Sequence, residues 1–155
     1  MAKMERMNLD EIDIEILKLL QMNSRMSFSE INQKVHLSVS AISERIKKLE
    51  STGVIKKYTT IIDHTKFDKN LTALVSIKLK KDNTLDDIGS FVENQPDIME
   101  CFLQTGAYDC LMKIVTRDTS SLKDILTQLN REINVEEMRT NIVLKPLKQM
   151  YSLNL

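Results

Sequence analysis

The chain has 155 residues, of which 42% are hydrophobic and 28% charged, a composition typical of a soluble globular protein with one or two small domains. Lysine and arginine number 22, as do aspartate and glutamate, so the formal net charge is zero. This balance excludes a protein that attracts nucleic acid through its overall charge, so any such affinity must come from a local basic patch.

The first 63 residues carry hydrophobic side chains at helical spacing, and three helices are predicted there. The first helix spans about residues 9–22 and has four carboxylates in its first turns. These charges favour the helix dipole but repel phosphate, so this helix is expected to face away from any DNA. The second helix begins at residues 27–30, where the S-x-x-E pattern predicts a capping box.

A short turn at His36 and Leu37 leads into the third predicted helix, residues 38–51. Ser38 is expected to cap its first turn, and Gly53 to follow its last turn. Its inward stripe, set by helical spacing, is predicted to contain Val39, Ile42, Ile46 and Leu49. The outward side then carries short polar residues first and basic residues later.

This order suits a helix that reads DNA. Short hydroxyl side chains let a helix approach base edges, and basic side chains a turn or two later meet the phosphate ridge. The alternative is an ordinary solvated helix with capping serines. The capped helix and the short turn before it, and the basic β-ribbon predicted after it, favour a DNA reader. Six lysines and arginines against two glutamates between residues 34 and 58 give this region a local charge of +4. The residues predicted to contact DNA are Arg25, Ser38, Ser40, Ser43, Glu44, Arg45, Lys47 and Lys48.

Residues 54–63, VIKKYTTIID, alternate imperfectly and are rich in β-formers, so a two-stranded wing or a linking strand is predicted. Three helices, the last two joined tightly, and this ribbon predict a winged helix-turn-helix domain over residues 1–63. The helix-turn-helix is placed at about residues 26–45, with the recognition helix at about residues 38–51.

Residues 64–155 are predicted to form a second domain, in the order strand, helix, strand, strand, helix, strand. The first strand, residues 71–79, alternates cleanly between apolar and polar side chains. The remaining elements are expected at residues 84–94, 98–105, 109–116, 120–133 and 138–147. The βαββαβ order predicts an α+β fold of the ferredoxin-like type, an antiparallel sheet with both helices on one face.

Cys101 and Cys110 lie in apolar runs and form no C-x-x-C pattern, so free thiols in a reducing cytoplasm are expected. His36 and His64 fall in a turn and a linker, outside any metal-spacing motif, so no metal or cofactor is predicted. The sequence contains no Ser/His/Asp order, P-loop, signal peptide or membrane-spanning stretch. These observations predict a cytoplasmic protein that is not an enzyme.

The sequence LDEIDIEILKLLQMNSRMSFSEINQKVHLSVSAISERIKKLESTGVIKKYTTIID closely resembles the N-terminal half of the Lrp/AsnC (feast/famine) transcriptional regulators. The elements that carry the resemblance are LDxID, NSRMSFSE, LSxS, ERIKKLE and GVIKKY. The second half continues it with CFLQTGAYDCLMKI, which is similar to the family's T-G-x-Y-D segment, and with RTNIVLK. The resemblance covers nearly the whole chain and implies a regulator that binds double-stranded DNA.

By resemblance, the second domain is the family's ligand-binding and oligomerising module, whose sheets pair into homodimers that commonly assemble into octamers. Members typically sense an amino acid or a similar small molecule between these domains. A glycine loop exposes N–H groups that suit an α-carboxylate, while Asp109 suits an ammonium group and Tyr108 an apolar side chain. The same segment is also compatible with a plain hairpin turn. The resemblance implies effector-binding roles for Thr105, Gly106, Tyr108, Asp109 and Thr140.

Two departures from the family pattern bear on specificity. Ala107 stands where many members carry a polar, often acidic, residue, which bears on the identity of the effector. Val39 and Ala41 stand where prolines are common in the recognition helix, which bears on the operator sequence. The alternative to an effector-controlled regulator is an architectural protein that wraps DNA without an effector.

Overall fold

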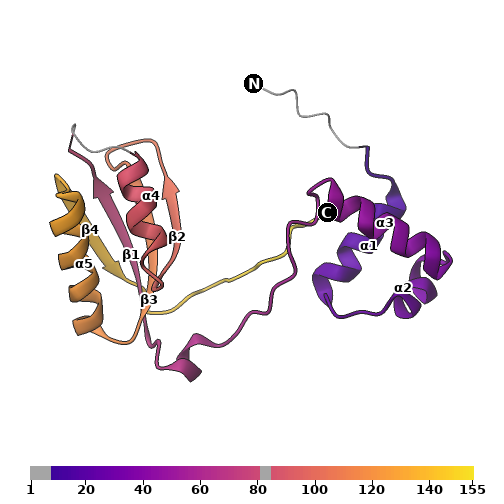
Figure 1. Cartoon of the computed structure of the whole chain (residues 1–155). Helices are drawn as coiled ribbons and strands as arrows, with labels where there is room; N and C mark the ends of the chain where they lie inside the picture. The colour runs from indigo at the N-terminus through magenta and orange to yellow at the C-terminus, as the bar shows by residue number, and fades with distance from the viewer. Residues whose placement is uncertain (1–7, 81–84) are drawn as a thin grey trace. The chain divides into compact units, whose positions relative to one another are not determined.

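The computed structural model describes residues 8–80 and 85–155 (Figure 1). The chain forms two compact units: one runs to Ile61 and also contains Lys148–Leu155, and the other spans Ile62–Leu147. The boundary expected from the sequence, after residue 63, lies two residues from this division. The sequence pattern gave no indication that the last eight residues group with the N-terminal unit.

The N-terminal unit contains three helices, α1 (Glu11–Met22), α2 (Phe28–Val35) and α3 (Val39–Ser51). Helix α1 begins two residues later than predicted because Asp10 is its N-cap. The Asp10 carboxylate accepts from the Asp13 N–H at 2.8 Å, and the Asp13 carboxylate accepts from the Asp10 N–H at 3.3 Å. This reciprocal capping box satisfies two backbone donors at the helix start.

The ends of α2 and α3 form as the sequence predicts. Ser27 and Glu30 make the predicted capping box at the start of α2. His36 ends α2 in the left-handed conformation, with φ 54°, and the Ser38 hydroxyl accepts a backbone hydrogen bond in the first turn of α3. Gly53 follows α3 with φ +74°, a conformation that favours glycine. Local sequence therefore specifies the turn between the two helices and the end of the second.

All three helices contribute to the core of the N-terminal unit. Its buried side chains are Ile16, Leu17, Leu19, Ile31, Ile42, Ile46 and Leu49. Three of the four residues predicted for the inner stripe of α3 are therefore confirmed. Val39 is the exception, because its side chain is 45% exposed. It is the first residue of α3, and the partly buried Val35 and Leu37 pack against the core before the helix begins.

Residues 54–63, all of which the structure describes, contain no strand, so neither the predicted two-stranded wing nor the alternative linking strand forms there. A strand needs a neighbour for its backbone groups, and this segment instead turns back onto α3. The Ile55 N–H donates to the Leu49 carbonyl at 3.0 Å, and the Ile55 side chain packs against the core. The Tyr58 hydroxyl donates to the Glu50 carboxylate at 2.8 Å.

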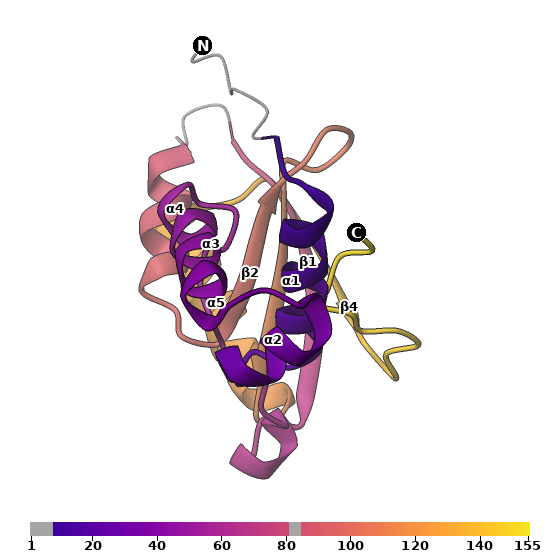
Figure 2. The same cartoon turned by 90° about the vertical axis from the view of Figure 1, so that its right-hand side faces the viewer.

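The C-terminal unit has the predicted βαββαβ order after a short 3-10 helix, η1. Its elements are η1 (His64–Phe67), β1 (Leu71–Lys78), α4 (Leu85–Glu93), β2 (Ile98–Leu103), β3 (Cys110–Thr116), α5 (Thr119–Ile133) and β4 (Glu137–Ile142). The strands are antiparallel in the order β2-β3-β1-β4, and both α4 and α5 lie on one side of the sheet (Figures 1 and 2). The ferredoxin-like fold is confirmed. Among the described helices, none is both long and apolar enough to cross a membrane.

The alternation of β1 decides which face of the sheet is buried. Ala73, Val75 and Ile77 are fully buried, as the pattern predicts, because this face lies under the two helices. The cross-strand partners of Val75 and Ile77 are Met112 and Cys110, which are buried with them. The side chains of α4 and α5 in this core are Ile88, Phe91, Leu122, Ile125, Leu129 and Ile133.

Two residues of α3 provide a matched pair for testing the packing of the N-terminal unit. We expect Ile42→Ala to lower the free energy of unfolding by about 2–5 kcal/mol, because the fully buried side chain leaves a cavity. Val39→Ala should lower it by less than about 1 kcal/mol, since Val39 is half exposed. Urea denaturation of the two variants measures the difference. Equal losses would contradict the orientation of α3 described above.

Candidate functional site

The exposed side of α3 carries four of the eight residues predicted to contact DNA. Ser40, Glu44 and Lys47 are exposed and follow one another at spacings of four and three, so they share one stripe of the helix. Lys48 is also exposed, and Ser43 is half-buried beside the stripe. The stripe therefore runs from short polar groups near the N-terminus of α3 to lysines two turns later.

Ser38 lies at the start of this stripe, but its hydroxyl is engaged within the helix. The Ser38 Oγ accepts from the Ala41 N–H at 3.2 Å and lies 3.0 Å from the Ser40 Oγ. An N-cap hydroxyl has its acceptor capacity committed to the helix end. The capping role of Ser38 is therefore clear in the structure, and Ser40 presents the first hydroxyl of α3 proper.

Arg45 differs from the other predicted contact residues because it points into its own domain. Its Nη1 lies 2.7 Å from Asp10 Oδ2 and 2.7 Å from Asp13 Oδ1. The Arg45 side chain is 30% exposed and that of Asp13 only 7%. Hydrogen bonds from the Asp13 backbone N–H and from Arg45 lower the pKa of the Asp10 carboxyl, so this carboxylate stays charged at neutral pH. This network ties α3 to the start of α1.

Several other basic side chains near Arg45 are exposed. The exposed basic residues on and around α2 and α3 are Arg25, Lys34, Lys47, Lys48, Lys56 and Lys57. Lys56 and Lys57 lie between two anchor points, Ile55 in the core and Tyr58 on Glu50. Burial, followed by the hydrogen bond to Glu50, raises the pKa of Tyr58 to about 12, so this anchor stays protonated at neutral pH. The segment thus keeps its lysines beside α3.

The predicted effector loop is the hairpin between β2 and β3. The Gln104 N–H donates to the Asp109 carbonyl at 2.9 Å, which closes the loop, and Gly106 at its tip has φ +123°. Thr105 and Gly106 are exposed, and a Cβ at Gly106 would meet no atom within 4 Å. The tip therefore offers accessible backbone, and its conformation is one that side-chain-bearing residues rarely adopt.

Asp109 and Tyr108 tie this loop to the neighbouring strands. The Asp109 N–H donates to the Ile77 carbonyl at 2.9 Å, and the Asp109 carboxylate accepts from the Leu79 N–H at 2.7 Å. The Tyr108 hydroxyl donates to Glu137 Oε1 at 2.6 Å, and this hydrogen bond raises the pKa of Tyr108. The loop base is thus fixed to the end of β1 and the start of β4.

Thr140 lies apart from the loop. It is exposed on β4 and pairs with Val75 in the middle of β1. Because side chains alternate along a strand, Thr140 shares the helix-covered face with Met138, while Glu137 projects to the other face. The structure therefore brings Tyr108 and Asp109 together with Glu137, and it does not bring Thr140 into that group.

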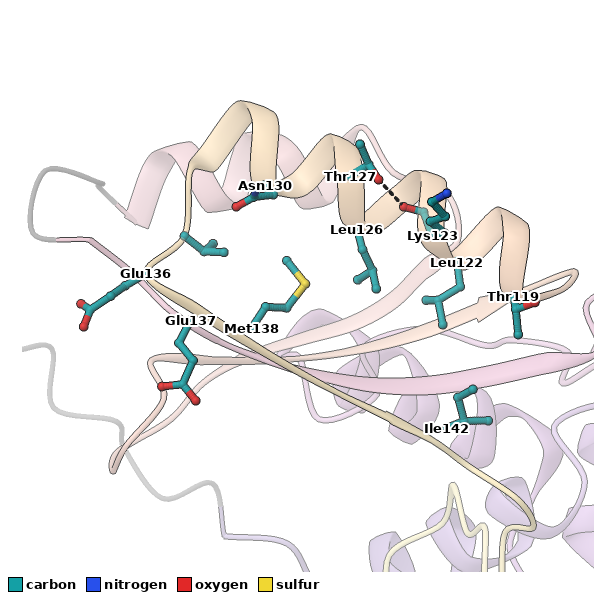
Figure 3. Close-up of a pocket in the computed structure, with 11 residues that line it drawn as sticks. Thr119, Leu122, Lys123, Leu126, Thr127, Asn130, Glu136, Glu137, Met138 and Ile142 are labelled. Atoms are coloured by element: carbon teal, nitrogen blue, oxygen red, sulfur yellow. Dashed lines mark hydrogen bonds between the residues drawn. The ribbon is translucent and has the colours of Figure 1, made fainter.

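A groove of about 600 Å³ runs between α5 and the edge strand β4 (Figure 3). Leu122 and Leu126 project into it from α5, opposite Met138 and Ile142 of β4. Its volume lies in the range of small-molecule sites, and its lining is mainly apolar. Glu137 is among the residues at one end of this α5/β4 groove, but its side chain points away from the groove to the opposite face, where it accepts from Tyr108.

The two cysteines are free thiols, as predicted. Cys110 is fully buried, and burial raises its pKa to about 11, which leaves it a poor nucleophile at neutral pH. Cys101 is half-buried, and burial raises its pKa too. Within residues 8–80 and 85–155, no cluster of three or more histidines, cysteines or acids is arranged to hold a metal ion.

Three carboxylates that shape these sites were not predicted as site residues: Asp13, Glu50 and Glu137. Each pairs with a side chain on another segment, and nothing local marks a carboxylate as paired. A partial signal exists for Asp13, because it lies three residues before the buried Ile16 on the inner stripe of α1. An acid on an apolar stripe requires a cation, and Arg45 supplies it.

Comparison with known proteins agrees with this division of the chain. Residues 9–50 match the AsnC-type helix-turn-helix domain, and residues 72–153 match the Lrp/AsnC ligand binding domain. The transcriptional regulator FL11 of Pyrococcus horikoshii is 37% identical over 144 residues, which cover 93% of this chain and 95% of that protein. The two domain matches and the sequence identity to FL11 thus both indicate a transcriptional regulator.

Two solved structures share the fold over almost their full length. The transcriptional regulator NMB0573 from Neisseria meningitidis, solved as an L-Met complex, is 28% identical with a TM-score of 0.86 and covers 94% of this chain and 96% of its own. The feast or famine regulatory protein from M. tuberculosis, complexed with L-methionine, is 26% identical with a TM-score of 0.87 and covers 94% and 98%. The chain belongs to the Lrp/AsnC family of transcriptional regulators.

Proposed function

We propose that this regulator reads double-stranded DNA with the exposed stripe of α3 and responds to an amino acid or a similar small molecule. The observation that carries the proposal is the order of side chains on that stripe. Ser40 and Glu44 are exposed near the N-terminus of α3, and Lys47 and Lys48 are exposed two turns later. Base edges would meet the short polar groups, and phosphates would meet the lysines.

Arg45 has a different role in this proposal from that of its neighbours. Its guanidinium bridges Asp10 and Asp13, so it fixes how α3 is rotated about its axis relative to α1. The rotation of a recognition helix decides which side chains reach the groove. Arg45 is therefore a positioning residue, and the contacts to DNA come from residues around it.

The effector site that we propose is the β2–β3 hairpin loop. Two relatives of known structure hold L-methionine, which makes this amino acid the first probe to use here. The exposed backbone around Gly106 suits an α-carboxylate, and Asp109, whose carboxylate accepts only one protein hydrogen bond among the described residues, suits an ammonium group. Tyr108 lies between this group and Glu137.

The oligomer that we propose is a homodimer formed through the sheet face opposite the helices, with further assembly of dimers into octamers. Phe102 pairs with Leu111 across β2 and β3, and Leu74 lies on the same face of β1. Phe102 is 51% exposed and Leu74 36% exposed in the single chain. An apolar face of this kind favours a self-complementary contact with a second copy.

Lys47→Ala/Lys48→Ala tests the phosphate contacts. We expect weaker binding to a random-sequence duplex, and a slope of log affinity against log salt reduced by about 2, because each lost phosphate contact removes about 0.9. Gel shifts from low to moderate salt measure the slope. Lys18→Ala/Lys66→Ala, which removes two exposed lysines elsewhere, is the control and should leave the slope unchanged. An unchanged slope in the first variant would place the DNA surface elsewhere.

Arg45→Gln tests the positioning role. We expect the free energy of unfolding to fall by about 2 kcal/mol, because the nearly buried Asp13 loses its cation. Affinity for DNA should fall while the salt slope stays that of the wild type. A double-mutant cycle with Asp13→Asn should show that the two stability losses are not additive. A stable variant whose slope falls by about 1 would instead identify Arg45 as a phosphate contact.

Asp109→Asn tests the effector site. The amide oxygen can still accept from the Leu79 N–H, so the loop should persist, while the loss of charge should raise the Kd for L-methionine about tenfold. Isothermal calorimetry measures the Kd, and Asp124→Asn, an exposed acid of α5, is the control. Equal affinity in all three proteins would exclude Asp109 from the site. Heat with none of the twenty amino acids would favour the architectural, effector-independent alternative.

A further inference from the structure

The C-terminal segment makes a contact with α1 that the proposed function does not use. The side-chain amide of Gln21, in the last turn of α1, hydrogen-bonds to both backbone groups of Leu153. The Leu153 N–H donates to Gln21 Oε1 at 2.6 Å, and Gln21 Nε2 donates to the Leu153 carbonyl at 3.3 Å. These two residues are 132 positions apart in the sequence.

This pairing has the chemistry of a strand contact. A carboxamide carries the same donor and acceptor as a peptide group, so one glutamine side chain can satisfy both backbone groups of an extended residue. Leu153 lies outside any helix or strand, and without Gln21 its backbone groups would be left to water. Gln21 therefore binds the backbone of one residue of the C-terminal segment.

Exposure along the segment agrees with docking. Leu144 and Leu147, in the connection that leaves β4, are 97% and 95% exposed. Beyond Lys148, where the chain rejoins the N-terminal unit, the hydrophobic side chains are less exposed but still at the surface, with Met150 at 60%, Tyr151 at 64%, Leu153 at 76% and Leu155 at 43%. The segment is thus held mainly through the backbone of Leu153, while its side chains stay at the surface.

We infer that residues 148–155 are a docking segment that ties β4 to the DNA-binding unit through Gln21. The chain enters the C-terminal unit near Ile62 and leaves it at Leu147, so two connections join the units instead of one. A second attachment removes part of the orientational freedom that one flexible connection allows. In a homodimer, this restraint limits the spacings at which two recognition helices can be presented together. The inference about spacing rests on the proposed DNA-reading function, whereas the docking itself does not.

Amide hydrogen exchange at Leu153 tests the docking in the full-length protein. We expect this amide to be protected in the wild type and to exchange at least about tenfold faster in Gln21→Ala, because the variant removes its acceptor. Gln33→Ala is the control, since Gln33 is an exposed glutamine of α2 in the same unit and has no side-chain hydrogen bond to any described residue. Equal exchange at Leu153 in the wild type and Gln21→Ala would overturn the docking.

Half-site spacing tests the restraint. A dimer that carries two recognition helices binds two half-sites on the DNA. The first probe is a duplex selected in vitro with the wild-type protein. The second is the same duplex with five base pairs inserted between the half-sites, which turns one half-site by about half a helical turn relative to the other. We expect the insertion to weaken wild-type binding about tenfold and to weaken binding by Gln21→Ala and by Leu153→Pro, which lacks the N–H donor, about threefold or less. Equal sensitivity in wild type and variants, or no sensitivity in the wild type, would overturn the restraint. Failure of the wild type to select any duplex would instead reject the proposed function, with docking still decided by exchange.

Discussion

The bridge from Arg45 to Asp10 and Asp13 ties α3 to the start of α1, and the proposed DNA-reading geometry depends on it. Asp13 is nearly buried, and a buried carboxylate is tolerated only with a partner that restores the solvation it has lost. Arg45 provides that partner from α3, so the ion pairs favour the rotational setting of α3 that places Arg45 beside α1. The buried Ile42 and Ile46 then face inward, and Ser40 and Lys47 face out.

This arrangement also determines which kind of charge is left at the surface. Arginine is suited to rigid, bidentate contacts, and here it is used inside the domain. The exposed cations on α3 and the following segment are lysines, which act as mobile point charges and tolerate variation in the position of a phosphate. In the proposed function, sequence preference comes from the short polar side chains at the start of α3, where the backbone can come closest to the bases.

Sequence patterns predicted the features that local chemistry controls. The capping box at Ser27, the left-handed Gly53 and the buried face of β1 all follow from spacings within a few residues. Arg45 and the Gln21–Leu153 contact could not be predicted in this way, because their partners lie 32 and 132 positions away along the chain. A charged residue has the same local pattern whether it is free or paired. The predicted wing fails for a related reason, since a strand is defined by a neighbour that the local sequence does not specify.

The long-range contacts form a connected series from the hairpin loop to the recognition helix. Tyr108 links the loop to Glu137 at the start of β4, and β4 continues by peptide bonds into the segment that Gln21 holds. Gln21 belongs to α1, whose first turn holds α3 through Asp13. Every step is a covalent bond or a hydrogen bond, so at the proposed loop site a ligand that displaced Tyr108 from Glu137 would act on the strand that continues into the segment held by Gln21.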